Sequence, residues 1–275
     1  MINSNYVTQL ESHLAQKYAK ELLTNDLTTK GIEFFGGNTI RIPFGMLDSY
    51  IRGDSFTHQG IYNRKITKVL SHDRDAEFQV DTSDVDEAEQ MAAATNITNV
   101  FESEYAIPET DAYRLSKIYQ DFVEFGGIVD DTSLDANNVL AVYDKFMHSM
   151  DKVEVPKVGR ILYATPAVNR LLEQSTKLNQ RAYYQDKVKV VVVPIGRMFS
   201  AYDFTNSFDP MADAKQINMM LTHPSAVIAA TKHSYIKLWP PGTHTLGDMY
   251  LYQNRRFSDL FVVEARLSGI AINAN

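Results

Sequence analysis

The chain has 275 residues, of which 44% are hydrophobic and 22% charged, so it is long enough to fold around one large core or two smaller ones. Its net charge of -7 argues against a protein that reads nucleic acid, and the lack of cysteine excludes disulfides and thiolate metal sites. Without a signal-peptide pattern or an apolar run of about 18 residues, we expect neither export nor membrane spanning.

The first predicted element is an amphipathic helix over residues 7–23. Its apolar side chains recur near the helical period and form one stripe: Val7, Leu10, Leu14, Tyr18 and Leu22. A polar stretch without periodicity follows over residues 24–31. Because a single helix cannot bury its own stripe, we expect residues 1–30 to form an N-terminal arm that lies on another surface.

Residues 38–80 have the composition of β-strands, with glycines between the runs. If residues 38–51 and 61–80 are the two arms of one antiparallel hairpin, the arms extend about 45 to 65 Å. A compact chain of this length has a radius of gyration of only about 19 Å. We therefore expect a hairpin that projects from the body and packs on a neighbour.

Residues 84–105 predict a long helix, with Ser83 or Asp84 as its N-terminal cap. Ile107-Pro108 should break this helix, because the residue before a proline avoids the helical region. Pro108 then suits the first turn of a second helix, which Gly126-Gly127 ends.

Helices and strands alternate in the next part of the chain and predict a small α/β module. The expected elements are a helix over residues 135–152, a strand over 160–164, a helix that begins at Thr165 and Pro166, and a strand over 188–193. Near the C-terminus, residues 248–252 and 260–263 are two β-rich runs. We expect the turn-prone residues 254–256 to separate them.

The sequence has no phosphate-binding glycine loop, no serine-hydrolase elbow and no histidine pair at the spacing of a helical metal site. Four acids have the close spacing of a hard-cation site, but helix capping explains them more simply: Asp84, Asp86, Glu87 and Glu89. Arg52-Gly53-Asp54 matches an integrin-binding tripeptide, but a match of three residues carries little information and a turn explains Gly53 better. We therefore expect no catalytic, cofactor-binding or metal-binding residues and no cofactor.

Charges alternate in His72-Asp73-Arg74-Asp75, beside a predicted strand. This pattern suits an exposed strand edge that is protected against uncontrolled pairing, or a set of ion pairs between subunits. Both interpretations favour a structural or interaction protein over an enzyme.

Three motifs follow one another in this region. An Asp-Arg-x-x-x-Phe-x-x-Asp strand end contains Arg74, Phe78 and Asp81, an Asp-Val-Asp-Glu helix start spans residues 84–87, and Pro-Glu-x-Asp-Ala-Tyr spans residues 108–113. In this order and spacing they resemble the major capsid proteins of tailed bacteriophages, in the subgroup common in phages of Gram-positive bacteria. Further matching runs lie within residues 155–163, 223–228 and 257–270, so the resemblance covers about residues 30–275.

The resemblance implies an α+β fold of the Hong Kong 97 capsid type. Its expected parts follow the chain in order: an N-terminal arm at 1–30, an extended loop at 31–82, a peripheral domain with a long spine helix at 83–127, an α/β axial domain at 128–234, and the C-terminal strands of the peripheral domain at 235–275.

The resemblance also implies a function. The chain would be a structural protein and not an enzyme, and its hexamers and pentamers would form the icosahedral head that encloses phage DNA. It would be assembled in the host bacterial cytoplasm and located in the virion, with a scaffolding protein, a portal protein and head-completion proteins as partners. Contact with packaged DNA would be passive, and no membrane would be involved.

Two alternatives stay open. The first is the shell protein of an encapsulin-like nanocompartment, which shares the fold but encloses enzyme cargo. The second is an unrelated α/β enzyme that uses the acids of residues 84–89 with a divalent metal.

Overall fold

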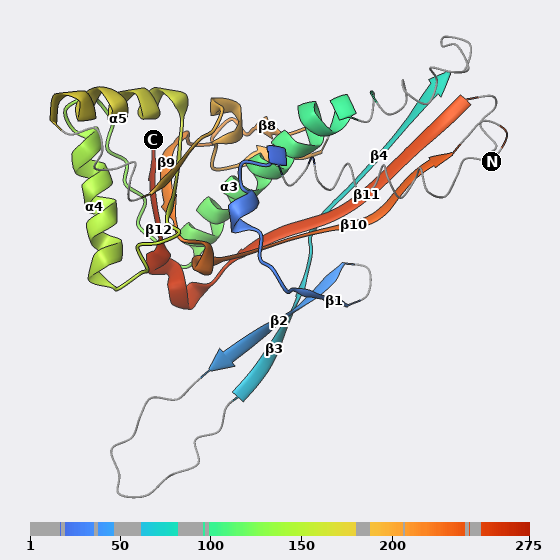
Figure 1. Cartoon of the computed structure of the whole chain (residues 1–275), viewed down its shortest axis with the longest axis horizontal. Coiled ribbons are helices and arrows are strands. Elements are labelled where there is room, and N and C mark those ends of the chain that lie inside the picture. Colours follow the sequence, from blue (N-terminus) through green and yellow to red (C-terminus); the bar gives the residue numbers. More distant parts are fainter. Residues whose placement is uncertain are drawn as a thin grey trace, which may run out of the picture.

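The structure is a computed structural model of the whole chain. It describes residues 17, 20–35, 38–46, 62–81, 96, 99–179, 188–205, 207–239, 242 and 249–275. One long helix lies between an extended antiparallel sheet and a compact α/β unit, and a separate hairpin leaves the body (Figure 1).

The extended sheet has the strand order β10 (Val227–Trp239), β11 (Met249–Val262) and β4 (His72–Asp81), all antiparallel. The prediction that residues 254–256 form a turn is wrong, because β11 continues through them and pairs Asn254 with Ala76 of β4. The buried side chain of Asn254 has a partner on the adjoining helix, so tertiary contacts outweigh the local turn preference.

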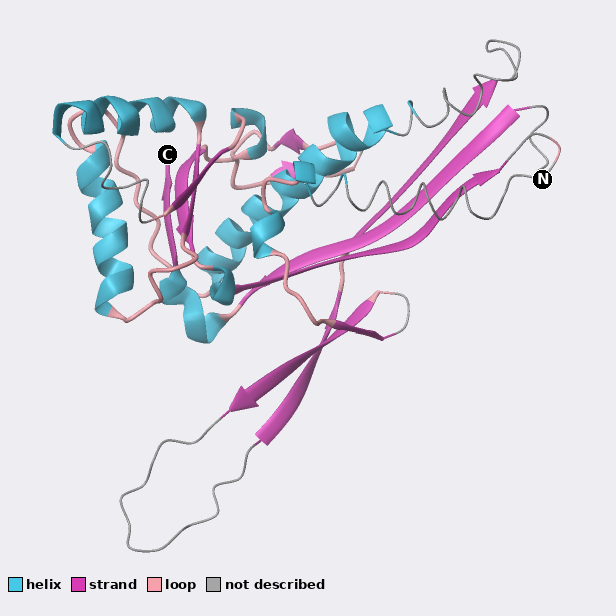
Figure 2. Ribbon diagram, viewed as in Figure 1, coloured by secondary structure: helices cyan, strands magenta, loops and turns pink. Residues whose placement is uncertain are grey.

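The hairpin consists of β2 (Thr39–Met46) and β3 (Tyr62–Val69), with the short β1 (Glu33–Phe35) beside β2. It points away from both the extended sheet and the α/β unit (Figure 2). The prediction that residues 61–80 form a single arm is wrong, because β3 pairs with β2 whereas β4 pairs with β11.

The chain changes sheets at Leu70 and Ser71. Leu70 is buried, and its N–H donates to the carbonyl of Asn38 at 2.7 Å. The N–H of Ser71 donates to Oδ2 of Asp259 at 2.8 Å, on the extended sheet. The arms of the projecting hairpin are therefore shorter than the sequence predicts, and residues 47–61 at its tip lie outside the described ones.

The long helix is α3 (Ile107–Glu124), and a π-helical turn, Glu102–Ala106, leads directly into it. The predicted break at Ile107-Pro108 is wrong. The N–H of Ile107 donates to the carbonyl of Glu102, five residues back, so the widened turn admits Pro108 without ending the helix. The expected helix start at residues 84–87 lies outside the described residues.

The predicted end of this helix is confirmed. Gly126 has a φ of +83° and the N–H of Gly127 donates to the carbonyl of Phe122 at 2.8 Å, which is the usual C-terminal arrangement.

The α/β unit contains a four-stranded sheet in the order β12 (Ile270–Ala274), β9 (Ile217–Thr222), β5 (Ile161–Ala164) and β6 (Lys189–Val192). Helices α4 (Val139–Lys152) and α5 (Pro166–Asn179) share a core with one face of this sheet, and α3 shares a core with the other. The predicted helix, strand, helix and strand are thus confirmed. Residues 235–275 divide between two sheets, because β11 joins the extended sheet and β12 joins the α/β unit.

Among the described residues, no helix combines the length and the hydropathy needed to cross a bilayer.

Candidate functional site

Helix α3 is unusually polar for a helix buried on several sides. It carries six buried polar or charged side chains: Glu109, Thr110, Asp111, Arg114, Ser116 and Asp121. Buried polar groups need hydrogen-bond partners. The hydroxyls of Thr110 and Ser116 donate to carbonyls one turn back, whereas the charged side chains bind segments far away in the sequence. The helix therefore joins the extended sheet, the N-terminal segment and the α/β unit.

Glu109, in the first turn of α3, binds the beginning of β4. Its Oε1 lies 3.1 Å from Nε2 of His72 and 2.7 Å from Nε of Arg74. Burial opposes ionisation, but the hydrogen bonds from His72 and Arg74 outweigh it and hold the pKa of Glu109 below its ordinary value. The carboxylate thus stays charged between two residues of the alternating His72–Asp75 run.

The surroundings of this carboxylate are aromatic. The His72 ring stacks on Tyr113, with centroids 4.0 Å apart, and meets the edge of Phe204. Arg74 also donates to the carbonyl of Phe204 at 2.5 Å. A loop of the α/β unit therefore closes over the Arg74–Glu109 pair.

Tyr113 and Asp259 hold the start of β4 against β11. The Tyr113 hydroxyl donates to Oδ1 of Asp259 at 2.9 Å, and the Ser71 hydroxyl donates to Oδ2 at 2.7 Å. Burial and the charge of Asp259 raise the pKa of Tyr113, so the phenol remains a donor.

The alternating charges of residues 72–75 lie on the edge strand of the extended sheet, as predicted. His72 and Arg74 turn towards α3, whereas Asp73 pairs with Arg255 of the adjacent strand at 2.6 Å. These three residues therefore form ion pairs or hydrogen bonds within the chain.

Asp111 and Arg114 bind the segment that follows the predicted arm. Asp111 accepts hydrogen bonds from the backbone N–H and the hydroxyl of Thr24, both at 2.9 Å. Arg114 donates to the carbonyl of Thr24, to the Thr28 hydroxyl and to the Thr231 hydroxyl of β10, each at 3.1 Å. Burial raises the pKa of Asp111, and the hydrogen bonds from Thr24 oppose that shift.

Residues 24–31 were predicted to lie on another surface. The first of them, Thr24 to Thr28, instead pack on α3 of the same chain. Leu27 belongs to the main core, and Leu22, the last residue of the predicted stripe, packs against Ala106 and Ile107. Residues 1–16, which hold most of the stripe, lie outside the described residues.

The π-helical turn contacts β11 through Glu102. This side chain is buried, and its Oε1 accepts a hydrogen bond from Nδ2 of Asn254 at 2.7 Å. Burial raises the pKa of Glu102, and the charge of Arg256 opposes the rise. Phe78 of β4 stacks on Tyr252 beside this contact, at 4.6 Å between centroids.

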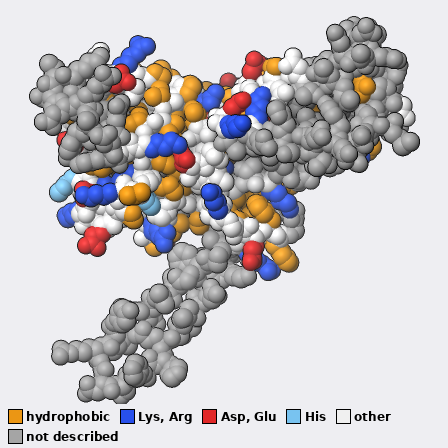
Figure 3. Space-filling model, viewed as in Figure 1, with side chains coloured by type: hydrophobic (Ala, Val, Ile, Leu, Met, Phe, Trp, Pro, Cys, Tyr) orange, Lys and Arg blue, Asp and Glu red, His pale blue; other side chains and the backbone are white. Residues whose placement is uncertain are grey.

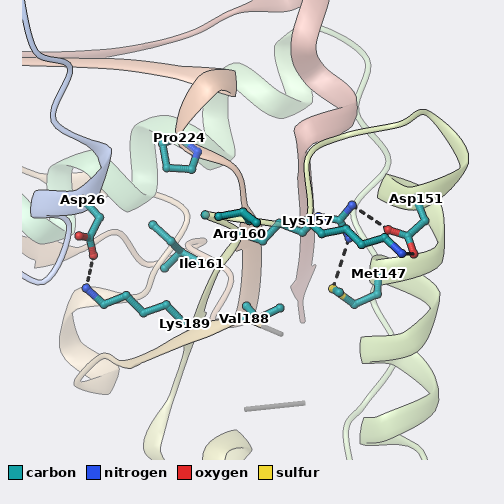
Figure 4. Close-up of a pocket in the computed structure, with 11 residues that line it drawn as sticks. Asp26, Met147, Asp151, Lys157, Arg160, Ile161, Val188, Lys189 and Pro224 are labelled. Carbon is teal, nitrogen blue, oxygen red and sulfur yellow. Dashed lines mark hydrogen bonds and ion pairs between the residues drawn. The ribbon is translucent and has the colours of Figure 1, made fainter. Parts of the chain in front are cut away.

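A hollow of about 700 Å³ opens where the N-terminal segment meets the α/β unit (Figure 4). Asp26 pairs with Lys189 at one side. At the other side, the fully buried guanidinium of Arg160 lies 2.7 Å from Asp151 and donates to the carbonyls of Val155 and Pro156. Arg160 thereby fixes the loop that forms the rim.

His223, in one of the matching runs, is a turn cap. Its Nδ1 lies 2.7 Å from the Ser225 hydroxyl and accepts from the Ser225 N–H at 3.2 Å. Its Nε2 faces the carbonyl of Val158 at 3.2 Å, so both ring nitrogens hold backbone segments in place.

The acids at residues 84–89, which the sequence analysis weighed as a hard-cation site, lie outside the described residues. Within the described ranges, no three histidine, aspartate or glutamate side chains gather as a metal site requires. The polar residues of α3 were not predicted as a site, although Glu109, Asp111 and Tyr113 belong to the third motif. The order of the motifs was the signal that could have joined them.

No protein-family model matches the sequence, and no curated protein is similar enough in sequence to match. Solved structures do match. The chain is similar to a subunit of the mature capsid of bacteriophage PhiM1, with a TM-score of 0.55 and 15% identity over 86% of this chain and 82% of that one. It is also similar to the capsid of cyanophage P-SCSP1u, with a TM-score of 0.55 and 12% identity over 88% and 84% of the two chains.

The chain has the Hong Kong 97 capsid fold. This fold also matches a virus-like particle from Pyrococcus furiosus, with a TM-score of 0.51 and 11% identity over 98% of this chain and 99% of that one. At these identities the comparisons identify the architecture, and the function is inferred from the chain's own features.

Proposed function

We propose that the chain is the major capsid protein of a tailed phage, which assembles into the closed shell that encloses the genome. The observation that carries this proposal is the hairpin β2–β3, which leaves the body on its own (Figure 1). A two-stranded ribbon is marginally stable in water, so it needs the surface of another molecule. In a shell of identical subunits, that surface is supplied by the next copy.

The register of the hairpin supports this interpretation. Alternate positions of a strand share one face, and positions 40, 42, 44 and 46 of β2 are all apolar in the sequence. At the base of the hairpin, Ile40 is buried in a cluster with Leu70 and Phe257. The apolar sequence continues outward from this cluster along the ribbon, which is the pattern of a binding surface.

Basic and aromatic side chains extend the surface at the base of the hairpin, where Figure 3 shows hydrophobic and basic side chains close together. Phe34 and Phe35 of β1 are 42% and 58% exposed, and Val69 is 56% exposed. The Arg41 guanidinium lies 3.9 Å from the centre of the Phe35 ring. Exposed apolar groups beside cations are typical of protein interfaces.

Charge along the sequence is complementary to this surface. Strands β2 and β3 contain four basic residues and no acidic one: Arg41, Arg64, Lys65 and Lys68. Between Arg74 and Arg114 the chain has no lysine or arginine but eleven acidic residues. Three of these, Glu102, Glu109 and Asp111, are buried in the subunit. The other eight are Asp75, Glu77, Asp81, Asp84, Asp86, Glu87, Glu89 and Glu104. A basic hairpin of one copy and an acidic segment of the next attract one another.

The finer parts of the proposal follow the resemblance. Subunits form hexamers and pentamers. The N-terminal residues are the arm, the hairpin β2–β3 is the extended loop, the extended sheet with α3 is the peripheral domain, and the α/β unit, which includes β12, is the axial domain. Scaffolding, portal and head-completion proteins act in assembly in the host cytoplasm, and the product is the virion. The net charge of -7 suits a container that touches DNA passively.

One further candidate has an observation in its favour. The similarity to a virus-like particle from Pyrococcus furiosus spans nearly the whole of both chains and supports an encapsulin-like nanocompartment. Neighbouring genes discriminate the two candidates. Terminase, portal and protease genes indicate a phage head, whereas a peroxidase or ferritin-like gene indicates a nanocompartment.

Negative-stain microscopy of the full chain, expressed alone and with its genomic neighbours, tests the shell directly. We expect closed hollow particles of uniform size in at least one preparation. Soluble subunits with no particles in any preparation would overturn the proposal.

A further inference from the structure

The segment that ends at Leu22 and the hairpin that starts near Glu33 share one root. This root comprises residues 22–29, between them in the sequence. It runs across α3 and reaches β10, where the N–H of Thr29 donates to the carbonyl of Ala229 at 3.0 Å. Whatever fixes the root also fixes where the chain enters it and where the hairpin starts.

The root is held by buried charge as well as by apolar packing. Thr24 is fully buried, and Asp111 and Arg114 are 0% and 1% exposed. The Asp111 carboxylate accepts hydrogen bonds from the N–H of Leu23, at 3.3 Å, and from the N–H of Thr24, while Arg114 donates to the Thr24 carbonyl. Because the two side chains are three positions apart on α3, they form one receptor for this short stretch of backbone.

The receptor also includes the α/β unit and β10. Arg197, in the 3₁₀ turn Ile195–Arg197, donates to Oδ2 of Asp111 at 3.3 Å. Arg114 reaches Thr28 and Thr231 with its other contacts. Burying two charges for ordinary core packing is costly, and charged partners at fixed geometry instead give directional specificity.

We propose that Asp111 and Arg114 are positioning residues that fix the course of the root, and thereby the directions in which the chain enters it at Leu22 and leaves it towards the hairpin. This inference rests on the proposed shell function, since a fixed course lets every copy present its hairpin to its neighbours in the same way. Its consequence is a division of roles along α3. Asp111 and Arg114 control assembly geometry, whereas other buried acids of α3 serve stability.

Asp121 is the matched control for Asp111. It is 6% exposed, lies on the same helix, pairs with Lys117 at 2.8 Å and accepts from the N–H of Val262 at 3.2 Å. It therefore resembles Asp111 in burial and bonding but binds β11. Asp121→Asn should weaken the fold without moving the root.

The sharpest variant is Thr24→Val, which removes one hydroxyl between Asp111 and Arg114 and preserves the side-chain shape. Thr24→Ser keeps the hydroxyl and serves as the rescue. In the full-length protein, we expect Thr24→Val to accelerate amide exchange at Leu23 and Thr24 about tenfold, the effect of losing a hydrogen bond to a charged group. Exchange in β5 and β9 should stay unchanged.

Direction is measured separately by spin labels, since the chain has no cysteine of its own. Lys20→Cys and Gln174→Cys place labels at exposed positions on the root side and on α5. We expect a narrow distance distribution in this background and with Thr24→Ser or Asp121→Asn. We expect a broad one with Thr24→Val or Asp111→Asn.

Microscopy of the same variants completes the test. Thr24→Val should give open or irregular assemblies, and Thr24→Ser and Asp121→Asn should give normal ones. A narrow distribution and normal exchange in Thr24→Val, or a distribution equally broad in Asp121→Asn, would overturn the positioning role. Failure of the wild type to form particles would overturn the shell function, while the exchange and distance results would still decide the role of the pair.

Discussion

The Nε atom of Arg74 lies 2.7 Å from Oε1 of Glu109, although the two residues are 35 positions apart in the sequence. This pair joins the edge strand of the extended sheet to the first turn of α3. It also links the first and the third of the motifs that resemble those of phage capsid proteins, so the motif spacing has a direct physical meaning.

Glu109→Gln should destabilise the subunit by about 2 to 4 kcal/mol, because it leaves the buried His72 and the partly buried Arg74 without their anionic partner. Urea unfolding of the purified protein measures this loss. Asp73→Asn is the control, since its pair with Arg255 is about half exposed and should contribute much less. Equal effects of the two substitutions would contradict the central role of Glu109.

The free energy of unfolding should fall between about pH 4 and pH 2 because of Asp130. Burial opposes its ionisation, but Lys145 and Thr132 outweigh burial and lower the pKa of Asp130 to about 2. A lowered folded pKa gives stability above the unfolded value, and this stability is lost as the pH falls through the folded value.

Lys145 is 70% exposed, so solvent screens the pair and the loss should be about 1 kcal/mol. Asp130→Asn should remove that part of the acid transition in a series of unfolding curves. An unchanged acid transition in Asp130→Asn would show that other carboxylates account for it.

The two glycines after α3 should respond differently to alanine. Gly126→Ala meets no atom within 4 Å but forces a side chain into the left-handed region at φ +83°, which costs about 1 kcal/mol. In Gly127→Ala the new Cβ would lie 2.6 Å from the buried Phe122 ring, and overpacking should cost about 1 to 3 kcal/mol. Thermal unfolding of both variants gives the order, and a less stable Gly126→Ala would contradict this packing.

Tyr163→Phe should leave stability unchanged or raise it by about 1 kcal/mol. The Tyr163 hydroxyl is buried in the main core and has no hydrogen-bond partner among the described residues. Tyr202→Phe is the counterpart, because its hydroxyl donates to the carbonyl of Gly196 at 2.9 Å and accepts from the N–H of Phe199 at 3.0 Å. Tyr202→Phe should lower the free energy of unfolding by about 1 kcal/mol or more, as measured by thermal unfolding. A large loss of stability in Tyr163→Phe would contradict the burial of this hydroxyl without a hydrogen-bond partner.

Added salt should raise the protein concentration needed for assembly, because the basic hairpin and the acidic segment attract each other less when screened. Lys68→Glu, at an exposed position of β3, should raise that concentration further, whereas Lys152→Glu at the end of α4 should not. Light scattering across a dilution series measures the threshold. Identical thresholds at low and high salt would argue against charge pairing between subunits.

Local patterns were sufficient to predict the α/β unit. The apolar stripe of α4, the Thr165 and Pro166 start of α5 and the β-rich runs on either side depend on residues close together in the sequence. The same is true of the helix end at Gly126, where one positive φ determines the termination.

Long-range contacts account for the failures. Asn254 stays in β11 because Glu102, 152 positions away, accepts its side-chain amide. The chain leaves the hairpin at Leu70 because a buried cluster there includes Ala230 and Phe257. The candidate site could not be predicted from the sequence for the same reason, because the partners of Asp111 lie more than 80 residues away.

The most direct test of the account is a cryo-electron microscopy map of the assembled particle. We predict a closed icosahedral shell in which the hairpin β2–β3 of one subunit lies on the acidic segment, residues 75–113, of the next. A shell in which each hairpin contacts only its own subunit, or a particle without icosahedral order, would contradict it.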